Sequence, residues 1–215
     1  MPSSSRHCTD SRATYHHGNL REALVDAAVQ LIEEGGIEKL SVRETAKRAG
    51  VSPGAPFRHF PTRTALLTAV AEQATQRLNE SVHAALGAVA DEPPLRRLAA
   101  IGHAYLKWAQ DHPTHFKVIS DRGLIDYAAS QSMRESNQAI QDQMQLLLEQ
   151  ASQAGASRLD APLARLASRA MVYGLARMVT DGHFPEWGPR GFNTEQAVGE
   201  TLDFFMSLME SSSKC

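Results

Sequence analysis

Cysteine is nearly absent from this 215-residue sequence: its two cysteines, Cys8 and Cys215, lie close to the two ends. A disulfide between such positions has no compact region to fasten, which excludes a small disulfide-stabilised scaffold. The first ten residues are polar and show no apolar segment followed by a small-residue cleavage site, so we do not expect secretion. The reducing cytoplasm is the compartment that we expect for this chain.

Long apolar stretches are also missing, although 42% of the residues are hydrophobic. No run approaches the roughly 20 apolar residues that a membrane-spanning helix requires. The chain is long enough to bury a core of ordinary size, and its 21% of charged residues is usual for a globular protein. We therefore expect a soluble globular protein without a membrane partner.

Motifs of catalysis and metal binding are missing as well. The chain contains no CxxC, HExxH or GxSxG pattern and no phosphate-binding glycine loop. The rival hypothesis of an enzyme depends on four histidines, His103, His112, His115 and His183. Two of them, His112 and His115, straddle a proline at a helix break, which is a poor base for a rigid site. We expect no enzyme, no metal site and no cofactor.

Positive charge is in slight deficit overall but is concentrated in one segment. The formal net charge is −2, yet residues 39–63 contain six basic residues against a single acidic one, Glu44. Such a patch on a near-neutral protein is typical of a nucleic-acid contact, and it is also found on ordinary solvated helix faces. The six basic residues are Lys39, Arg43, Lys47, Arg48, Arg58 and Arg63.

Apolar residues recur at helical spacing along almost the whole chain, and no segment shows the alternation of a strand. Proline and glycine mark most of the helix ends. An all-α fold is therefore predicted. The predicted helices cover about residues 20–35, 42–49, 62–91, 95–111 and 130–154, a short piece around Phe116, and two segments that begin near Asp160 and Asn193.

The segment "SVRETAKRAGVSPGAPFRHFPTR", residues 41–63, predicts two short helices joined by a tight turn. Ser41, with a glutamate three residues later, is typical of a capping box at a helix start. Gly50 suits a left-handed C-cap, and Ser52 with Pro53 suits the first positions of the next helix. The pair is either a helix-turn-helix, whose second helix enters the major groove of DNA, or a plain packing unit.

A longer segment, "TYHHGNLREALVDAAVQLIEEGGIEKLSVRETAKRAGVSPGAPFRHFPTRTALLTAVAEQ", resembles the DNA-binding domain of the tetracycline-repressor (TetR) family of bacterial transcription regulators. The resemblance implies a flexible arm over residues 1–15, a three-helix DNA-binding domain over 16–63, and a helical ligand-binding and dimerisation domain over 64–215. A long helix connects the two domains. The candidate DNA-binding residues are Arg43, Ser52, Pro53, Gly54, Ala55, Phe57, Arg58, His59 and Arg63.

The basic residues of this segment are expected to make different contacts. Arg58 can fork onto O6 and N7 of a guanine, whereas Arg43 and Arg63 are expected at phosphates, where they set the register. For Lys47 and Arg48 we favour an exposed helix face without a DNA contact.

Two positions differ from what the family leads us to expect. Where the family commonly has a tyrosine, this chain has Phe57, whose ring we expect to pack beside Phe60 and hold the second helix down. Pro56 disfavours helical geometry at Ala55 and removes one N–H group. The recognition helix is therefore expected to start late or to open with a loose turn.

The segments "HPTHFKVI" and "VYGLARMVTDG", residues 112–119 and 172–182, resemble a widespread ligand-binding C-terminal subclass of the family, from which this chain differs at Arg169 and Tyr173. Aromatic and methionine side chains of the central helices are candidates for a ligand pocket, with core packing as the alternative for each. Arg122 and Arg169 are candidate partners for an anionic ligand. The candidate ligand-binding residues are Tyr105, Trp108, Phe116, Met144, Met171, Tyr173 and Met178.

The last two predicted helices have the features of an interface. Ala167, Ala170 and Gly174 share one face and permit close helix contact, either within the monomer or across a two-fold axis. DNA binding favours the second arrangement, because two heads one helical turn apart read a pseudo-palindrome. We predict a homodimeric repressor that binds double-stranded operator DNA and is released by a small-molecule effector; a ligand-independent regulator and an activator are the alternatives.

Overall fold

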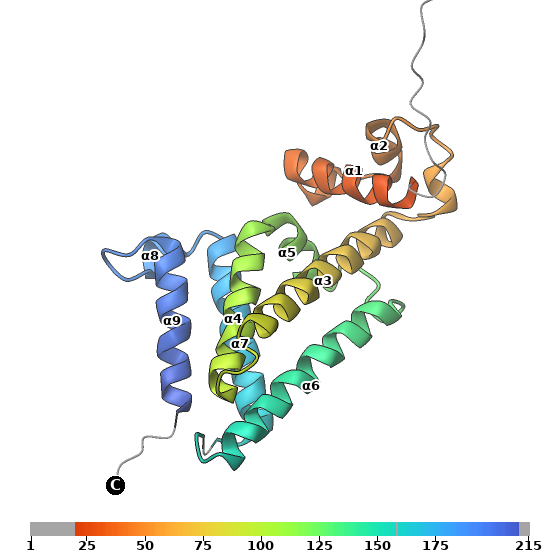
Figure 1. Ribbon diagram of the computed structural model, residues 1–215. Helices are drawn as coiled ribbons and strands as arrows, with labels where there is room; N and C mark the ends of the chain where they lie inside the picture. The colour runs from red at the N-terminus through yellow and green to blue at the C-terminus, as the bar shows by residue number, and fades with distance from the viewer. Residues whose placement is uncertain (1–19, 158, 211–215) are drawn as a thin grey trace, which may run out of the picture. The chain divides into compact units, whose positions relative to one another are not determined.

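The computed structural model describes residues 20–157 and 159–210, which form two compact units. The first unit ends at Pro61 and the second begins at Thr62. The all-α prediction is confirmed, since every regular element of the described residues is a helix (Figure 1). None of these helices is long and apolar enough to cross a membrane. The arm predicted over residues 1–15 and both cysteines lie outside the described residues.

The first unit contains α-helices α1 and α2 and two short 3-10 turns, η1 and η2, and the second contains α3 to α9. Capping side chains begin five of the helices where the sequence predicts a start: Ser41, Thr62, Ser130, Asp160 and Asn193 each accept a hydrogen bond from the backbone N–H three residues later. The bounds are α1 Leu20–Gly35, η1 Ile37–Lys39, α2 Val42–Arg48, η2 Pro56–Arg58, α3 Arg63–Ala88, α4 Pro94–Asp111, α5 Pro113–Ser120, α6 Gln131–Gln153, α7 Ala161–Thr180, α8 Phe184–Trp187 and α9 Thr194–Met209.

The turn after α2 has the geometry of a Schellman motif. Gly50 adopts φ +68°, its N–H donates to the carbonyl of Lys47 at 3.2 Å, and the N–H of Val51 donates to the carbonyl of Ala46 at 3.0 Å. Only glycine takes up this left-handed conformation without strain, so the predicted role of Gly50 is confirmed. The motif fixes the direction in which the chain leaves α2.

The segment after this turn is not the α-helix that the sequence led us to expect at Ser52 and Pro53. It opens with a turn closed by a 3.0 Å bond from the N–H of Ala55 to the carbonyl of Ser52, and the single 3-10 turn η2 follows. In an α-helix beginning at residue 53, the carbonyl of Ser52 would accept from the N–H of residue 56. That residue is Pro56, which has no N–H to donate.

The expectation about the backbone of Ala55 is also wrong. This residue adopts φ −62° and ψ −43°, within the helical region, although a proline follows it. The 3-10 turn begins directly at Pro56, which is fully buried. The predicted late start that opens with a turn is confirmed, because the helical residues begin only at Pro56, three residues after Pro53.

Phe57 and Phe60 do not share the apolar edge predicted for them. Phe60 is 2% exposed, and its N–H donates to the carbonyl of Pro56 at 2.8 Å, so that Pro56 and Phe60 are the buried pair. The guanidinium of Arg21 in α1 lies 5.6 Å from the centre of the Phe60 ring. Phe57, in contrast, is 42% exposed and does not belong to this buried pair.

Helix α4 is central in the second unit and contacts α3, α6, α7 and α9 (Figure 1). Its buried residues, Leu98, Ile101 and Tyr105 among them, belong to one apolar core that extends over all these helices. At Gly102 an added Cβ would lie 2.9 Å from a methyl group of Leu202, so glycine permits the close approach of α9. The short helix α8, between α7 and α9, was not predicted.

Replacement of Gly50 by alanine tests the Schellman turn. A Cβ at this position meets no atom within 4 Å, so the cost comes from the left-handed backbone alone. We expect Gly50→Ala to lower the free energy of unfolding by about 1–2 kcal/mol in urea titrations followed by circular dichroism. Gly54→Ala is the matched control, because Gly54 also has open space around it but no positive φ. Equal stability of the two variants would contradict this role for Gly50.

The two phenylalanines give a second test of the first unit. Phe60→Ala leaves a cavity in the core and is expected to lower the free energy of unfolding by about 3–5 kcal/mol. Phe57→Ala removes an exposed ring and should change it by no more than about 0.5 kcal/mol. Thermal unfolding of the two variants compares the same substitution at positions three residues apart, and a larger loss at Phe57 would overturn the packing described above.

Candidate nucleic-acid interface and ligand cavities

The segment from Ser52 to His59 presents most of its side chains to solvent. Of the candidate DNA-binding residues in the first unit, only Ala55 is half-buried, and the others are exposed. Arg43 is exposed on α2, while Arg63 is the first residue of α3 and therefore belongs to the second unit. The exposed candidates of the first unit are Arg43, Ser52, Pro53, Gly54, Phe57, Arg58 and His59.

One basic residue of α2 is neutralised within the first unit. Arg48 of α2 forms a two-bond ion pair with Glu34 of α1, with 2.7 Å between Nη1 and Oε1. The hydrogen bond from Arg48 lowers the pKa of the Glu34 carboxyl. Arg48 therefore joins α1 to α2, a role that we did not predict, and Arg43, Lys47 and Arg58 supply exposed positive charge.

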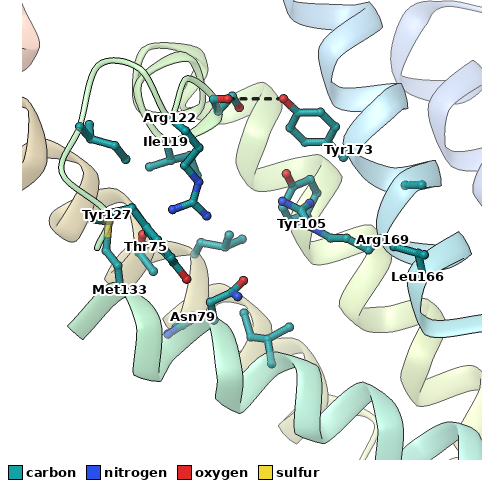
Figure 2. Close-up of a pocket in the computed structure, with 16 residues that line it drawn as sticks. Thr75, Asn79, Tyr105, Ile119, Arg122, Tyr127, Met133, Leu166, Arg169 and Tyr173 are labelled. Atoms are coloured by element: carbon teal, nitrogen blue, oxygen red, sulfur yellow. Dashed lines mark hydrogen bonds between the residues drawn. The ribbon is translucent and has the colours of Figure 1, made fainter. Parts of the chain in front are cut away.

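The second unit contains a cavity of about 360 Å³ that is partly open to solvent (Figure 2). Helices α3, α4, α5, α6 and α7 line it, together with the segment 121–130 between α5 and α6. Aliphatic side chains form much of the wall, and the polar groups include Asn79, Tyr105 and Arg169. A volume of this size lies within the usual range for small-molecule sites.

A second cavity of about 310 Å³ lies beside the first and extends to α9. Six residues line both cavities, so the two are neighbours across a shared wall. The shared residues are Leu78, Tyr105, Asn137, Ile140, Leu166 and Arg169.

The structure brings three of the seven candidate ligand-binding residues to these cavities. Tyr105 lines both, Tyr173 lines the first and Met144 lines the second. The two candidate partners of an anionic ligand, Arg122 and Arg169, both line the first. The remaining candidates pack in or against the core and line neither cavity: Trp108, Phe116, Met171 and Met178.

Tyrosine rings hold both of these arginines in place. The guanidinium carbon of Arg169 lies 4.8 Å from the ring centre of Tyr105 and 5.2 Å from that of Tyr173. Arg122 lies 3.4 Å from the ring centre of Tyr127. Burial raises the pKa of the Tyr105 phenol, and the nearby charge of Arg169 opposes this only in part. Tyr105 therefore stays a neutral hydrogen-bond donor at ordinary pH.

Several polar residues of the first cavity were missed in the sequence. Thr75 and Asn79 of α3 line it, as does Tyr127 of the segment 121–130. A signal existed for the first two, because they are four residues apart and lie beside Leu78 on the inward face of a helix. No periodicity marks Tyr127, since it lies outside any helix.

The four histidines do not form a common site. His103 of α4 pairs with Asp203 of α9 at 2.8 Å, and the buried His115 contacts Oε1 of Gln73 at 3.2 Å. Within the described part of the chain, no group of three or more His, Cys, Asp or Glu side chains is placed to hold a metal ion.

Comparison with known proteins places both parts of the chain in one family. Residues 24–70 match the family described as "Bacterial regulatory proteins, tetR family", and residues 98–205 match the "Tetracyclin repressor-like, C-terminal domain". The HTH-type transcriptional regulator BetI of Serratia proteamaculans (strain 568) is 29% identical over 86% of this chain and 89% of its own length. Alignments with the BetI proteins of Cronobacter sakazakii and Yersinia pestis span 50% and 41% of their lengths.

Two solved structures share the fold. A protein of unknown function from Rhodococcus sp. RHA1 superimposes with a TM-score of 0.76 at 28% identity, over 93% of this chain and 100% of that one. A tetR-family regulatory protein from Rhodococcus RHA1 reaches a TM-score of 0.69 at 17% identity, over 90% and 98% of the two chains.

These matches confirm the resemblance and the predicted function class. Members of the family bind DNA and dimerise, and they are transcriptional regulators rather than enzymes. The enzyme hypothesis built on the four histidines is thereby set aside. The chain belongs to the TetR family and is a DNA-binding transcriptional regulator.

Proposed function

We propose that this regulator is a ligand-responsive repressor, which binds a pseudo-palindromic operator as a homodimer in the bacterial cytoplasm and is released by a small-molecule effector. The observation that supports this is the cavity of about 360 Å³ with a partly polar wall inside the second unit. A ligand-independent regulator would be expected to fill this space with side chains. In this proposal residues 16–63 bind DNA, and residues 64–215 bind the effector and dimerise.

The DNA contacts that we propose follow from exposure and side-chain chemistry. Arg58 reads a guanine in the major groove, and Arg43 and Arg63 bind phosphates. The exposed ring of Phe57 is available for apolar contact with the DNA instead of core packing. The other proposed contacts are Ser52, Pro53, Gly54, Ala55 and His59.

A physical route joins the cavity to the helix that follows the DNA-binding unit. Segment 121–130 supplies Arg122 and Tyr127 to the cavity wall. The same segment is fastened to α3, because the N–H of Asp126 donates to Oγ1 of Thr68 at 2.9 Å. At its end the hydroxyl of Ser130 donates to the carboxylate of Glu72 at 2.8 Å.

The point of attachment favours a role in release from DNA. Thr68 and Glu72 lie in the first three turns of α3, and α3 begins directly after the first unit ends. An effector that moves segment 121–130 therefore acts on the start of α3. A coupling free energy of about 1–3 kcal/mol would weaken operator binding by roughly 5- to 150-fold.

The proposed dimer interface is the exposed apolar face of α7 and α9. Leu163 and Leu166 of α7 are 67% and 66% exposed, and Phe204 and Leu208 of α9 are each 64% exposed. Such large apolar side chains on neighbouring helices are typical of a protein contact. With the corresponding helices of a second copy they would form a four-helix bundle about a two-fold axis.

Operator binding tests the DNA-contact assignment. We expect wild-type protein to bind the DNA fragment that precedes its own gene, with an affinity that falls steeply with salt in fluorescence anisotropy. Arg58→Ala should lose about 1–3 kcal/mol of discrimination against unrelated DNA. Arg43→Ala should weaken binding to all sequences alike and reduce the salt slope by about one.

The control variant for this test is Arg96→Ala, an exposed arginine on α4 in the second unit. It should bind the operator as the wild type does. Undiminished sequence discrimination in Arg58→Ala would refute the assigned base contact.

Charge substitution on the apolar face tests the dimer. In the double variant Leu163→Glu, Phe204→Glu, a two-fold interface would juxtapose like charges from both copies at a cost of several kcal/mol. We expect dimer dissociation to become easier by roughly a hundredfold or more in sedimentation velocity experiments. The matched control is Leu146→Glu, a 48% exposed leucine on α6 that lies outside this face. A double variant that dimerises like the wild type would refute the interface.

A further inference from the structure

Among the described residues that line the first cavity of the second unit, two are basic and none is acidic. We propose that its effector is an amphipathic organic anion, a carboxylate or a similar group on an apolar body, held between Arg122 and Arg169. This inference rests on the proposed ligand-responsive function and gives the chemical class of the ligand.

In the part of the chain that the structure describes, no acidic side chain lines either cavity, whereas Arg122 and Arg169 line the first and Arg165 and Arg169 the second. Among the described residues, no carboxylate lies within ion-pair distance of Arg122 or Arg169. Both arginine side chains line the cavity and are also exposed to solvent, so water screens the repulsion between their two charges without removing it. A bound carboxylate removes this repulsion, and a cationic ligand would increase it.

The acids nearest to Arg122 in the sequence are already engaged. Oδ1 of Asp121 accepts the N–H of Gly123 at 2.9 Å, and Oδ1 of Asp126 accepts the N–H of Ala129 at 3.0 Å. Both carboxylates stabilise turns of segment 121–130, and neither lines the cavity. Arg122 is therefore not neutralised by its own segment.

The tyrosines orient the guanidinium groups without neutralising them. A guanidinium carries five N–H donors, so Arg169 can interact with the phenol oxygen of Tyr105 and still offer other donors to a carboxylate. Figure 2 shows Arg169 extending from α7 towards Tyr105, and Arg122 on the opposite side of the same space beside Tyr127. Two forks of this kind suit the planar oxygens of a carboxylate.

Further polar groups of the wall lack a partner. The hydroxyl of Ser120 is buried and makes no hydrogen bond within the described chain; Oδ1 of Asn79 is also buried without a partner, but it is an acceptor, so an anion does not supply what it lacks. Buried polar atoms without partners are rare, and a ligand can supply what is missing. The hydroxyl of Ser120 can donate to an anion, as can the neutral phenol of Tyr105.

The rest of the wall suits an apolar body. Leu78, Ile119, Ile125, Met133 and Ile140 supply aliphatic surface around the polar groups. A ligand that fills a cavity of about 360 Å³ therefore combines one anionic end with a hydrophobic remainder. A small inorganic anion would leave this surface uncovered.

Two fluorescent probes that differ by a single charged group test the inference. 8-Anilinonaphthalene-1-sulfonate is an apolar anion, and N-phenyl-1-naphthylamine is the same body without the sulfonate. We expect the full-length protein to bind the anion at least about tenfold more tightly, since hydrogen bonds to a charged group strengthen binding. The preference should be lost in the double variant Arg122→Gln, Arg169→Gln, whose affinity for the neutral probe should be unchanged.

Two further variants control for structure and for general charge. Arg122→Lys, Arg169→Lys keeps both charges and should retain most of the preference, which a merely structural defect would not allow. Arg96→Gln removes an exposed arginine of α4 and should bind both probes as the wild type does. Equal affinity of the wild type for the two probes, or an undiminished preference in the glutamine variant, would overturn the proposal.

Operator binding in the presence of each probe separates this inference from the function on which it rests. The anionic probe is expected to weaken operator binding roughly 5- to 150-fold. If it binds through the arginines but leaves operator affinity unchanged, the anion site stands and ligand-responsive release from this cavity fails. If only the neutral probe releases the DNA, ligand-responsive release stands and the anionic class is wrong.

Discussion

The burial of α4 among α3, α6, α7 and α9 is the packing on which both cavities depend. Tyr105 lies at the centre of this arrangement, because it faces the core and lines each cavity. Gly102, one turn earlier, allows α9 to approach close to α4. The second unit thus combines a tightly packed inner helix with two spaces along its sides, and the same residues that stabilise the fold limit the size and shape of a ligand.

In the proposed mechanism, arginines bind two different anions: the phosphates and bases of DNA in the first unit, and the carboxylate of the effector in the second. On the first unit, Arg43 and Arg58 are exposed and meet the DNA from solvent. In the second unit, Arg122 and Arg169 are backed by tyrosine rings that fix their orientation. All four side chains are exposed to solvent. Arginines on an open surface attract any polyanion and owe their selectivity to groove geometry, whereas arginines at the wall of a cavity select by the shape of the body attached to the charge.

The sequence predicted the fold well where local chemistry decides, as at the capped start of α2 and the glycine turn at Gly50. At the recognition segment it predicted the late start from Pro56 but not the 3-10 turn that replaces the α-helix, which arises because Pro56 cannot donate the first α-helical hydrogen bond. Phe60 is buried and Phe57 is exposed because of the way the chain turns here, so the sequence pattern, which indicated an α-helix, did not predict this difference. Aromatic and methionine side chains were a weak guide to the cavities, because the same residue types also fill the core. Trp108 packs in the core and lines neither cavity, whereas Tyr105 lines both.

Leu166 lines both cavities and is also 66% exposed on the face of α7 that we assign to the dimer. In the proposed assembly, one side chain therefore belongs at once to the wall of the effector site and to the contact between subunits. Occupancy of the cavity and self-association are then linked by mass action, and each shifts the other. The effector concentration needed for release would accordingly vary with the amount of repressor in the cell, so that the level of expression would itself adjust the sensitivity of the response.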